Sequence, residues 1–300
     1  MSEPPAVLPP SAAEELEGAL AILDAGRSRR YYDADADAAA ASAYYADTPA
    51  ERIGLLITTT HHHRPAYRPS REVYPWVDLH PARTLRSLYT GQTYDPAELI
   101  RADAAIAAHR YQRAHALAAV ADTSPAAIVD QLDAMLPYNC EHVVPQSWFG
   151  KAEPMRGDLH HLFACESRCN SFRGNTPYAE IADFPASPPE APDGTLGAVV
   201  RETCGKRDTA AFEPAHGKGA AARATFYVAL RYPGLIDPDE LSPERFGDLL
   251  LWHQTDPVSD WERHRNAAIH ERQGNRNPFV DHPTLAYDLL PALAGPSRTD

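Results

Sequence analysis

The chain of 300 residues lacks any apolar run near the roughly 20 residues that a membrane-spanning helix requires, so no membrane partner is expected. Residues 1–10 also lack a basic start followed by an apolar stretch. No secretory signal is therefore visible, and a cytoplasmic location is the default expectation. Positive charge is scarce too, because 28 lysines and arginines stand against 41 aspartates and glutamates, giving a net charge of −13. This balance disfavours a protein that coats nucleic acid, but a local basic cleft remains compatible with it.

Cysteine is scarce, and its four positions are Cys140, Cys165, Cys169 and Cys204. In a reducing cytosol, four thiolates would favour a structural Zn²⁺ site. In an exported protein, two disulfides would be favoured, with three pairings to choose from. Four independent buried thiols are the third alternative. The sequence leaves all three open.

Helix signals dominate most of the chain. Capping patterns or an early proline mark candidate helix starts at Ser11, Thr48, Asp95 and Ser242, and another helix is expected over residues 256–273, ended by Gly274. Residues 33–46 fit either helix or loop, and residues 183–193, with four prolines, indicate a long surface loop. We expect residues 1–10 and 295–300 to be disordered tails, and residues 11–294 to form a single domain.

Only the middle of the chain carries a strand pattern. Residues 140–144 and 160–164 are short and rich in apolar side chains, which is consistent with two antiparallel strands. Residues 165–175 then fit a short helix and its exit. The predicted fold class is α+β and mostly α: a helical body with an embedded ββα unit at about residues 138–178.

The same stretch places a carboxylate beside an imidazole. Glu141 and His142 are adjacent, and Asn170 follows within thirty residues. A hard divalent cation prefers oxygen ligands, which a carboxylate and an amide supply. A histidine that is largely neutral near pH 7 can take a proton from water. These residue types together predict metal-assisted hydrolysis of a phosphodiester.

Strand geometry raises one objection to this site. Neighbouring residues on a regular strand point to opposite faces, so Glu141 and His142 should diverge. Both could serve one site if the strand ends or distorts there. Pro145 indicates that it ends close by. The triple histidine His61-His62-His63 looks like a metal tag, but we interpret it as a polar loop.

Several sequence blocks resemble one known family. "NCEHVVPQSWFG", "GDLHHLF" and "CNSFRGNTPY" are similar to the endonuclease I family, bacterial periplasmic and extracellular nucleases of the His-Me finger (ββα-metal) group. "KGAAAR" ahead of Phe226-Tyr227 and the closing run "QGNRNPFVDHP" also resemble that family. The blocks extend from about residue 138 to residue 283 in the family's order, roughly half of the chain. Their joint specificity is high, whereas each block alone is weak.

The resemblance implies roles for particular residues. His142 would be the general base, and Glu141 and Asn170 would bind Mg²⁺, with Mn²⁺ or Ca²⁺ as substitutes. A basic residue that holds the cleaved phosphate maps to Arg173, Arg156 or Arg223. His161 and Asn175 would fix the ligands from behind. The amides of residues 273–279 either form a packed turn or orient the site from across the cleft.

The resemblance also has departures. Several relatives carry a glutamate where this chain has Arg156, and relatives are usually basic and exported, which would make this protein secreted as well. The first 130 or so residues match no block that we identify. The predicted function is a Mg²⁺-dependent endonuclease of low sequence specificity that acts on DNA, with RNA left open. An inhibitor protein is an expected partner if the enzyme is not exported.

Two other function classes compete with the nuclease. One is a non-catalytic, zinc-stabilised module that binds nucleic acid or protein and is derived from a nuclease. The other is a zinc hydrolase, which is weaker because the chain has no His-Glu-x-x-His spacing. The presence of Glu141, His142 and Asn170 favours the enzyme.

Overall fold

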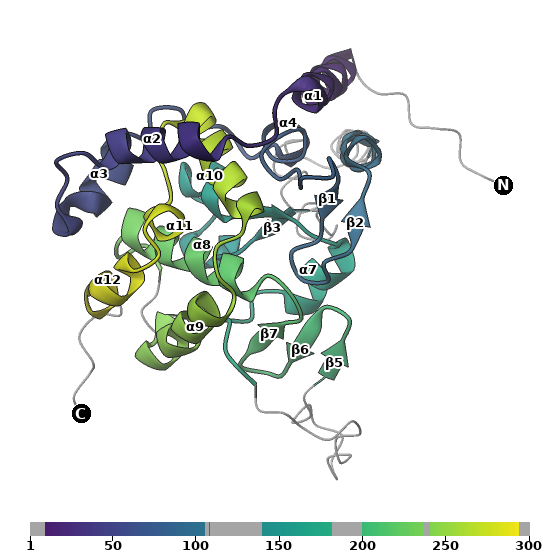
Figure 1. Cartoon of the computed structure of the whole chain (residues 1–300). Helices are drawn as coiled ribbons and strands as arrows, with labels where there is room; N and C mark the ends of the chain where they lie inside the picture. The colour runs from purple at the N-terminus through teal and green to yellow at the C-terminus, as the bar shows by residue number, and fades with distance from the viewer. Residues whose placement is uncertain (1–9, 106–107, 109–139, 182–199, 237–240, 294–300) are drawn as a thin grey trace, which may run out of the picture.

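A computed structural model describes residues 10–105, 108, 140–181, 200–236 and 241–293. Helices predominate and the strands are short, as the fold class predicted (Figure 1). The helices are α1 (Pro10–Ser28), α2 (Ala34–Tyr45), α3 (Ile53–Thr59), α4 (Pro69–Glu72), α7 (Ser167–Arg173), α8 (Lys218–Arg231), α9 (Pro243–Thr255), α10 (Asp260–Gln273), α11 (Pro278–Asp281) and α12 (Leu285–Leu293). Short 3₁₀ turns are η1 (Ala50–Arg52), η2 (Gln146–Phe149), η3 (Met155–Gly157) and η4 (Leu159–His161). No helix in these ranges is both long and apolar enough to cross a bilayer.

The predicted helix starts meet different outcomes. Asp95 accepts a hydrogen bond from the Glu98 amide at 3.0 Å, as a capping residue should. α9 begins with Pro243 after Ser242, as expected. α1 instead begins at Pro10, before Ser11, and the segment after Thr48 opens as the 3₁₀ turn η1.

Two further segments settle into helices. Residues 33–46, left open by the sequence, form α2, because the Asp33 side chain caps the amide of Ala36 at 3.2 Å. α10 starts at Asp260, four residues later than expected, with a full capping box between Ser259 and Glu262. It ends at Gly274 (φ 92°), as expected. The expected loop at 183–193 and most of the two tails lie outside the described residues.

Strands occur in more places than the sequence predicted. The strands are β1 (Leu85–Arg86), β2 (Thr93–Tyr94), β3 (Cys140–His142), β4 (Leu162–Ala164), β5 (Val200–Glu202), β6 (Gly205–Arg207) and β7 (Phe212–Pro214), in antiparallel sheets β1-β2, β3-β4 and β5-β6-β7. The expectation that only the middle forms strands is therefore wrong. The β3-β4 pair followed by α7 is confirmed, but each strand is shorter than expected because residues 159–161 form η4.

α8 lies at the centre of the helical body and packs against α9, α3, α11, α12 and η4 (Figure 1). Its first ten residues after Lys218 are almost all buried, because small alanines on several faces let neighbours approach closely. β3 lies between this body and the β1-β2 pair. The contact between α8 and η4 brings the central helix directly behind the β3-β4 pair.

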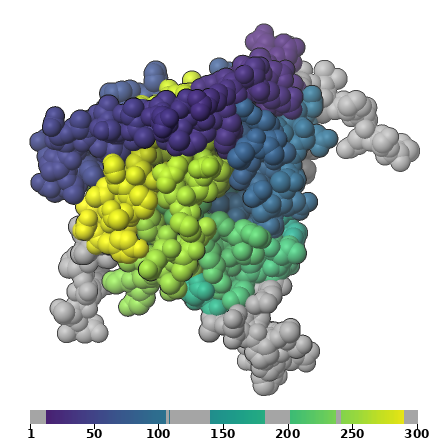
Figure 2. Space-filling model, viewed as in Figure 1, coloured from purple at the N-terminus to yellow at the C-terminus, as the bar shows by residue number. Residues whose placement is uncertain are grey.

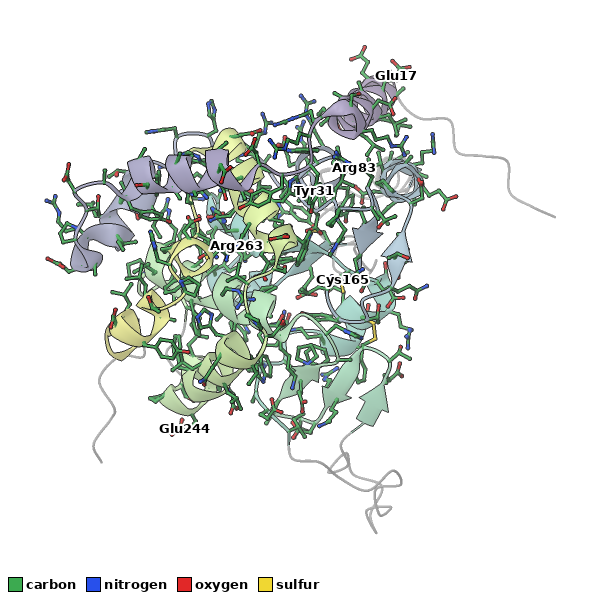
Figure 3. The ribbon with its side chains drawn as sticks, viewed as in Figure 1. Glu17, Tyr31, Arg83, Cys165, Glu244 and Arg263 are labelled. Atoms are coloured by element: carbon green, nitrogen blue, oxygen red, sulfur yellow. A yellow bond between two sulfur atoms is a disulfide. The ribbon has the colours of Figure 1, made fainter. Side chains whose placement is uncertain are left out.

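The N-terminal helices cover one face of the C-terminal ones, as Figure 2 shows. The junction is aromatic: the Tyr31 ring stacks on His264 of α10 at 4.2 Å, and the Arg83 guanidinium lies 5.3 Å from the Tyr31 ring (Figure 3). Arg276 extends the contact by bonding both Asp37 of α2 and Asp281 of α11, at 2.7 and 2.8 Å. The N-terminal segment is therefore an integral part of this fold.

Candidate active site

Glu141 is the middle residue of β3, is 1% exposed, and pairs with Phe163 of β4. Its Oε1 accepts a 2.5 Å hydrogen bond from the Arg173 guanidinium, whereas its Oε2 is buried without a hydrogen-bond partner among the described residues. Burial raises the pKa of Glu141 to about 7, against the opposing effect of Arg173. A buried oxygen without a partner is unfavourable, and a bound cation would remove that cost.

His142 is the last residue of β3, and its ring has a defined tautomer. Nε2 lies 2.9 Å from the carbonyl oxygen of Arg156. Because a carbonyl only accepts, Nε2 carries the proton and Nδ1 keeps the lone pair. Burial and the neighbouring His161 hold the pKa of His142 well below its usual value. The ring is therefore neutral at pH 7 and able to accept a proton at Nδ1.

Glu141 and His142 diverge as strand alternation requires, since Glu141 contacts Arg173 while His142 contacts the Arg156 carbonyl. β3 ends at His142, ahead of Pro145, as the sequence indicated. Asn170, on α7, donates from Nδ2 to the Cys140 carbonyl at 3.0 Å. The structure thus joins α7 to Cys140, the residue directly before Glu141.

Arg173 does not lie where a phosphate could reach it. Its side chain is fully buried on α7, and it donates to Glu141, to the carbonyls of His142, Val143 and Thr176, and stacks over Tyr178 at 4.4 Å. With these donors occupied, the guanidinium fixes β3 and the Glu141 carboxylate. The expectation that it acts as a catalytic or phosphate-binding group is not met by this placement.

Of the other two arginine candidates, Arg223 is also placed away from a phosphate role. It is 1% exposed and forms a bidentate pair with Glu262 at 2.7 and 2.9 Å. Arg156 is half-buried, its side chain donates to Gln146 at 3.0 Å, and its own carbonyl holds His142. Arg156 is therefore the candidate that combines a partly exposed cation with proximity to His142.

The two residues expected behind the ligands behave differently. His161 is buried, its Nε2 lies 2.7 Å from the Met155 carbonyl, and its ring meets His142 edge-on at 5.3 Å. It supports the imidazole by packing, without a hydrogen bond to it. Asn175 is exposed beyond the end of α7, outside the buried layer behind Glu141.

The closing run of the sequence reaches the site from behind. Gln273 accepts from the Leu159 amide at 2.7 Å and donates to Asp158 at 3.0 Å, and Asn275 donates to the Tyr227 hydroxyl at 2.7 Å. Tyr227 in turn donates to Asp158 at 2.8 Å. The amides of this run therefore fix the turn that leads into β4. A role in orienting the site from across the cleft stays a prediction.

A buried ion pair also holds β4 in place. Asp78 pairs with Arg265 of α10 and accepts a 2.5 Å hydrogen bond from the Ala164 amide. Arg265 donates to the carbonyls of Leu159 and Leu162 at 3.0 and 2.8 Å. Burial raises the pKa of Asp78, and the Arg265 charge opposes that rise. Both charges are well bonded, so the pair defines the position of β4.

The cysteines follow none of the three expected states in full. Cys169 of α7 and Cys204, between β5 and β6, form a disulfide, while Cys140 and Cys165 are free buried thiols. Figure 3 shows Cys165 close to that disulfide, drawn in yellow. The disulfide consumes two of the four sulfurs, so the expected four-thiolate zinc site does not form. One of the two expected disulfides is present.

The site fits a hard divalent cation. A Mg²⁺ ion keeps several waters and needs one or two protein oxygens, which Glu141 and Asn170 would supply. The unpartnered Glu141 Oε2 is the observation that supports this fit. Among the described residues, the one group of three His, Cys, Asp or Glu side chains close enough to share a metal is Glu166 with the disulfide-bonded Cys169 and Cys204.

Three parts of the site were not predicted from the sequence. Asp158 stands in the "GDLHHLF" block, but its role required Tyr227 and Gln273, which lie 69 and 115 residues away. The Asp78–Arg265 pair spans 187 residues and has no local signal. Tyr67, whose ring lies 4.8 Å from His142, comes from a segment without any recognised motif.

Known proteins share this arrangement of sequence blocks. The chain matches the family model for Endonuclease I over residues 87–284, which begins some fifty residues earlier than the sequence blocks indicated. An "Extracellular ribonuclease" of Bacillus subtilis (strain 168) is 34% identical over 170 residues, covering 51% of this chain and 54% of the relative. An "Extracellular deoxyribonuclease" of Aeromonas hydrophila is 28% identical over 162 residues, covering 47% and 64%.

A third relative, "Endonuclease-1" of Buchnera aphidicola subsp. Acyrthosiphon pisum (strain APS), is 26% identical over 158 residues, covering 47% of this chain and 58% of the relative. The chain thus spans about half of the length of several curated relatives that it matches. The family model covers about two-thirds of this chain and includes all of the residues predicted for the site. On these grounds the chain belongs to the endonuclease I family.

Proposed function

We propose that this protein is a metal-dependent endonuclease that hydrolyses phosphodiester bonds of DNA and RNA with little sequence preference. The observation that carries the proposal is the fixed tautomer of His142, whose Nδ1 keeps its lone pair; the preceding residue, Glu141, is a buried carboxylate with an unpartnered oxygen. In this proposal β3, β4 and α7 form the His-Me finger that presents both groups.

The residues of this chain would divide the reaction between them. His142 takes the proton from the attacking water at Nδ1, while the Arg156 carbonyl keeps the ring in the required tautomer. Glu141 and Asn170 would hold Mg²⁺, which supplies charge neutralisation at the phosphate and stabilises the leaving 3′-oxygen. Arg173 orients the Glu141 carboxylate, and Arg156 offers a positive charge next to the scissile phosphate. The expected products carry 5′-phosphates.

Two observations bear on substrate and location. Relatives named ribonucleases and deoxyribonucleases both match, so RNA stands beside DNA as a substrate. The Cys169–Cys204 disulfide favours an oxidising environment, and the relatives are named extracellular or periplasmic. We therefore propose that the protein acts outside the cytoplasm, which revises the default expectation from the sequence. An inhibitor is a partner only if active protein accumulates inside the cell.

The decisive experiment incubates the wild type and His142→Ala with supercoiled plasmid and with a structured RNA, in Mg²⁺ and in EDTA. We expect metal-dependent cleavage by the wild type and a loss of about 10²–10⁴-fold in the variant. Arg30→Ala, an exposed arginine on the segment after α1, serves as the matched control and should cleave like the wild type. If a folded wild type cleaves neither polymer with Mg²⁺ or Mn²⁺, the proposal fails and a binding module replaces it.

A further inference from the structure

Residues 61–71, called the arm here, run from just after α3 into α4 and lie outside the family match. The arm has the sequence HHHRPAYRPSR, with three arginines and no carboxylate, within a chain of net charge −13. No aspartate or glutamate occurs between Glu51 and Glu72. A cationic segment in an acidic protein needs a specific reason, and a polyanionic partner is one.

The arm is built into the fold. The amides of His62 and His63 donate to the Gln273 carbonyl at 3.0 and 3.2 Å. Pro65 presses so closely on Gly157 that a side chain at residue 157 would place its Cβ 1.9 Å from the Pro65 carbonyl oxygen. The arm backbone is therefore held against Gly157, and the carbonyl of the residue before it, Arg156, is the one that fixes His142.

The arm also contacts the general base directly. The half-buried Tyr67 ring lies 4.8 Å from the His142 ring, and the Arg156 guanidinium lies 5.3 Å from the Tyr67 ring. A tyrosine from the arm thus limits how the imidazole can tilt. Tyr67 also brings the arm to the edge of the site.

The flanking arginines face solvent. Arg64 and Arg68 are both exposed, and Arg68 pairs with Glu15 at 3.1 Å although its side chain is 52% exposed. Such an exposed ion pair contributes little to stability and is readily exchanged for a phosphate. These cations stand three residues before and one residue after Tyr67, so they are carried on the same short segment that touches His142.

We infer that the arm is a substrate-binding element of this nuclease: Arg64 and Arg68 contact the sugar-phosphate backbone, and Tyr67 positions His142. The inference rests on the proposed function and adds residues that the family match does not contain. The groups that the arm would bind are the backbone phosphates, which DNA and RNA share.

The cation half of the inference is tested by binding in EDTA, where no cleavage occurs. Fluorescence anisotropy would follow labelled DNA and RNA oligonucleotides bound to the wild type, to Arg64→Ala/Arg68→Ala and to Arg27→Ala/Arg52→Ala. The two double variants change net charge equally. Arg27 matches Arg68 as an exposed arginine in an exposed ion pair, and Arg52 matches Arg64 as an exposed arginine on a different element.

We expect the arm variant to bind about 10-fold more weakly and to lower the slope of log affinity against log salt by about 1–2. The control variant should change affinity less than about twofold, a difference typical of long-range charge alone at moderate salt. Equal affinities and salt slopes for the two double variants would show that the arm is not a substrate-binding element. This assay measures binding and needs no cleavage. An inactive wild type would therefore reject the proposed function, while the binding data would still decide whether the arm binds nucleic acid.

The Tyr67 half is tested by kinetics. Tyr67→Ala should lower kcat by about 10-fold or more with KM unchanged, because a misplaced base slows the reaction without loosening the substrate. Tyr67→Phe keeps the ring and should restore kcat. If Tyr67→Phe loses as much kcat as Tyr67→Ala, or if Tyr67→Ala keeps the wild-type kcat, the ring does not position His142.

Discussion

Two regions of very different chemistry support the β3-β4 pair. One, called the back wall here, consists of Asp158, Gln273 and the Asp78–Arg265 pair, all buried and bonded to one another or to the backbone. The other is the arm, which is bonded to Gln273 through backbone amides and contacts His142 through the Tyr67 ring, but which carries exposed arginines. From this difference we expect the back wall to determine geometry and stability, and the arm to contribute mainly to substrate affinity.

The largest effect is expected from breaking the ion pair of the back wall. Asp78→Ala leaves Arg265 as an uncompensated buried charge, which should lower the free energy of unfolding by about 3–5 kcal/mol. Chemical denaturation would measure it. A loss below about 1 kcal/mol would show that Arg265 finds another partner and that the wall is less specific than its contacts suggest.

Removing the disulfide should be nearly as severe. It closes a segment of 35 residues and joins α7, which carries Asn170, to the β5-β6-β7 sheet. Cys169→Ser/Cys204→Ser should lose about 3–4 kcal/mol of stability by the loop-entropy relation. A reductant should destabilise the wild type but leave the double variant unchanged. Equal melting temperatures for the oxidised wild type and the double variant would contradict a stabilising role of the disulfide.

Gln273 offers a sharper contrast within the back wall. Gln273→Ala leaves the Leu159 amide without a buried partner and removes one of the donors to Asp158, which should cost about 2–3 kcal/mol. The exposed Gln92→Ala is the matched control and should stay within about 0.5 kcal/mol. At a temperature where both variants are folded, Gln273→Ala should also cleave more slowly, because the turn into β4 is less fixed.

The buried His160, which lies in η4 two residues after Asp158, should also make the fold sensitive to acid. Burial lowers the pKa of His160 to about 3, and the charge of Asp158 only partly opposes this. As the pH falls through about 6.5, His160 therefore takes up a proton in the unfolded chain but stays neutral in the folded chain. Stability from this histidine is complete above pH 6.5 and falls by up to about 1.4 kcal/mol per pH unit below it.

Denaturant titrations at pH 7 and pH 5.5 would measure this slope. His160→Gln should reduce this slope but not abolish it, because burial also lowers the pKa of His80 and of His142. The exposed His63→Gln should leave the slope as in the wild type. Asp158, whose pKa is held at about 2 by the nearby histidines and by Gln273 against the effect of burial, stays ionised across this window. A wild type that is equally stable at both pH values would reject the assignment to His160.

The smallest effect on stability is expected in the arm. Arg68→Ala removes only an exposed ion pair with Glu15, so stability should change by about 0–1 kcal/mol while nucleic-acid binding weakens. Thermal melts beside the binding assay would separate the two properties. A large loss of stability in Arg68→Ala would show that the arm, like the back wall, stabilises the fold.

The sequence went furthest where the signal is local. Short blocks were enough to predict Glu141, His142 and Asn170 as site residues, which stay predictions, and α10 was placed to within four residues of its start and correctly at its end. Arg173 shows the limit of that reasoning. A conspicuous arginine next to the motif suggested a phosphate ligand, but burial and its full set of hydrogen bonds make it a support for Glu141.

By itself the sequence determined the family, the residue types of the site and the mostly helical class, because ligand chemistry and helix caps are properties of neighbouring residues. The tertiary structure alone decided the pairing of Cys169 with Cys204, the partnership of Asp78 with Arg265, and the approach of Tyr67 to His142. These contacts join residues 35, 187 and 75 positions apart. Their formation depends on burial and close packing across the whole chain, which no local pattern encodes.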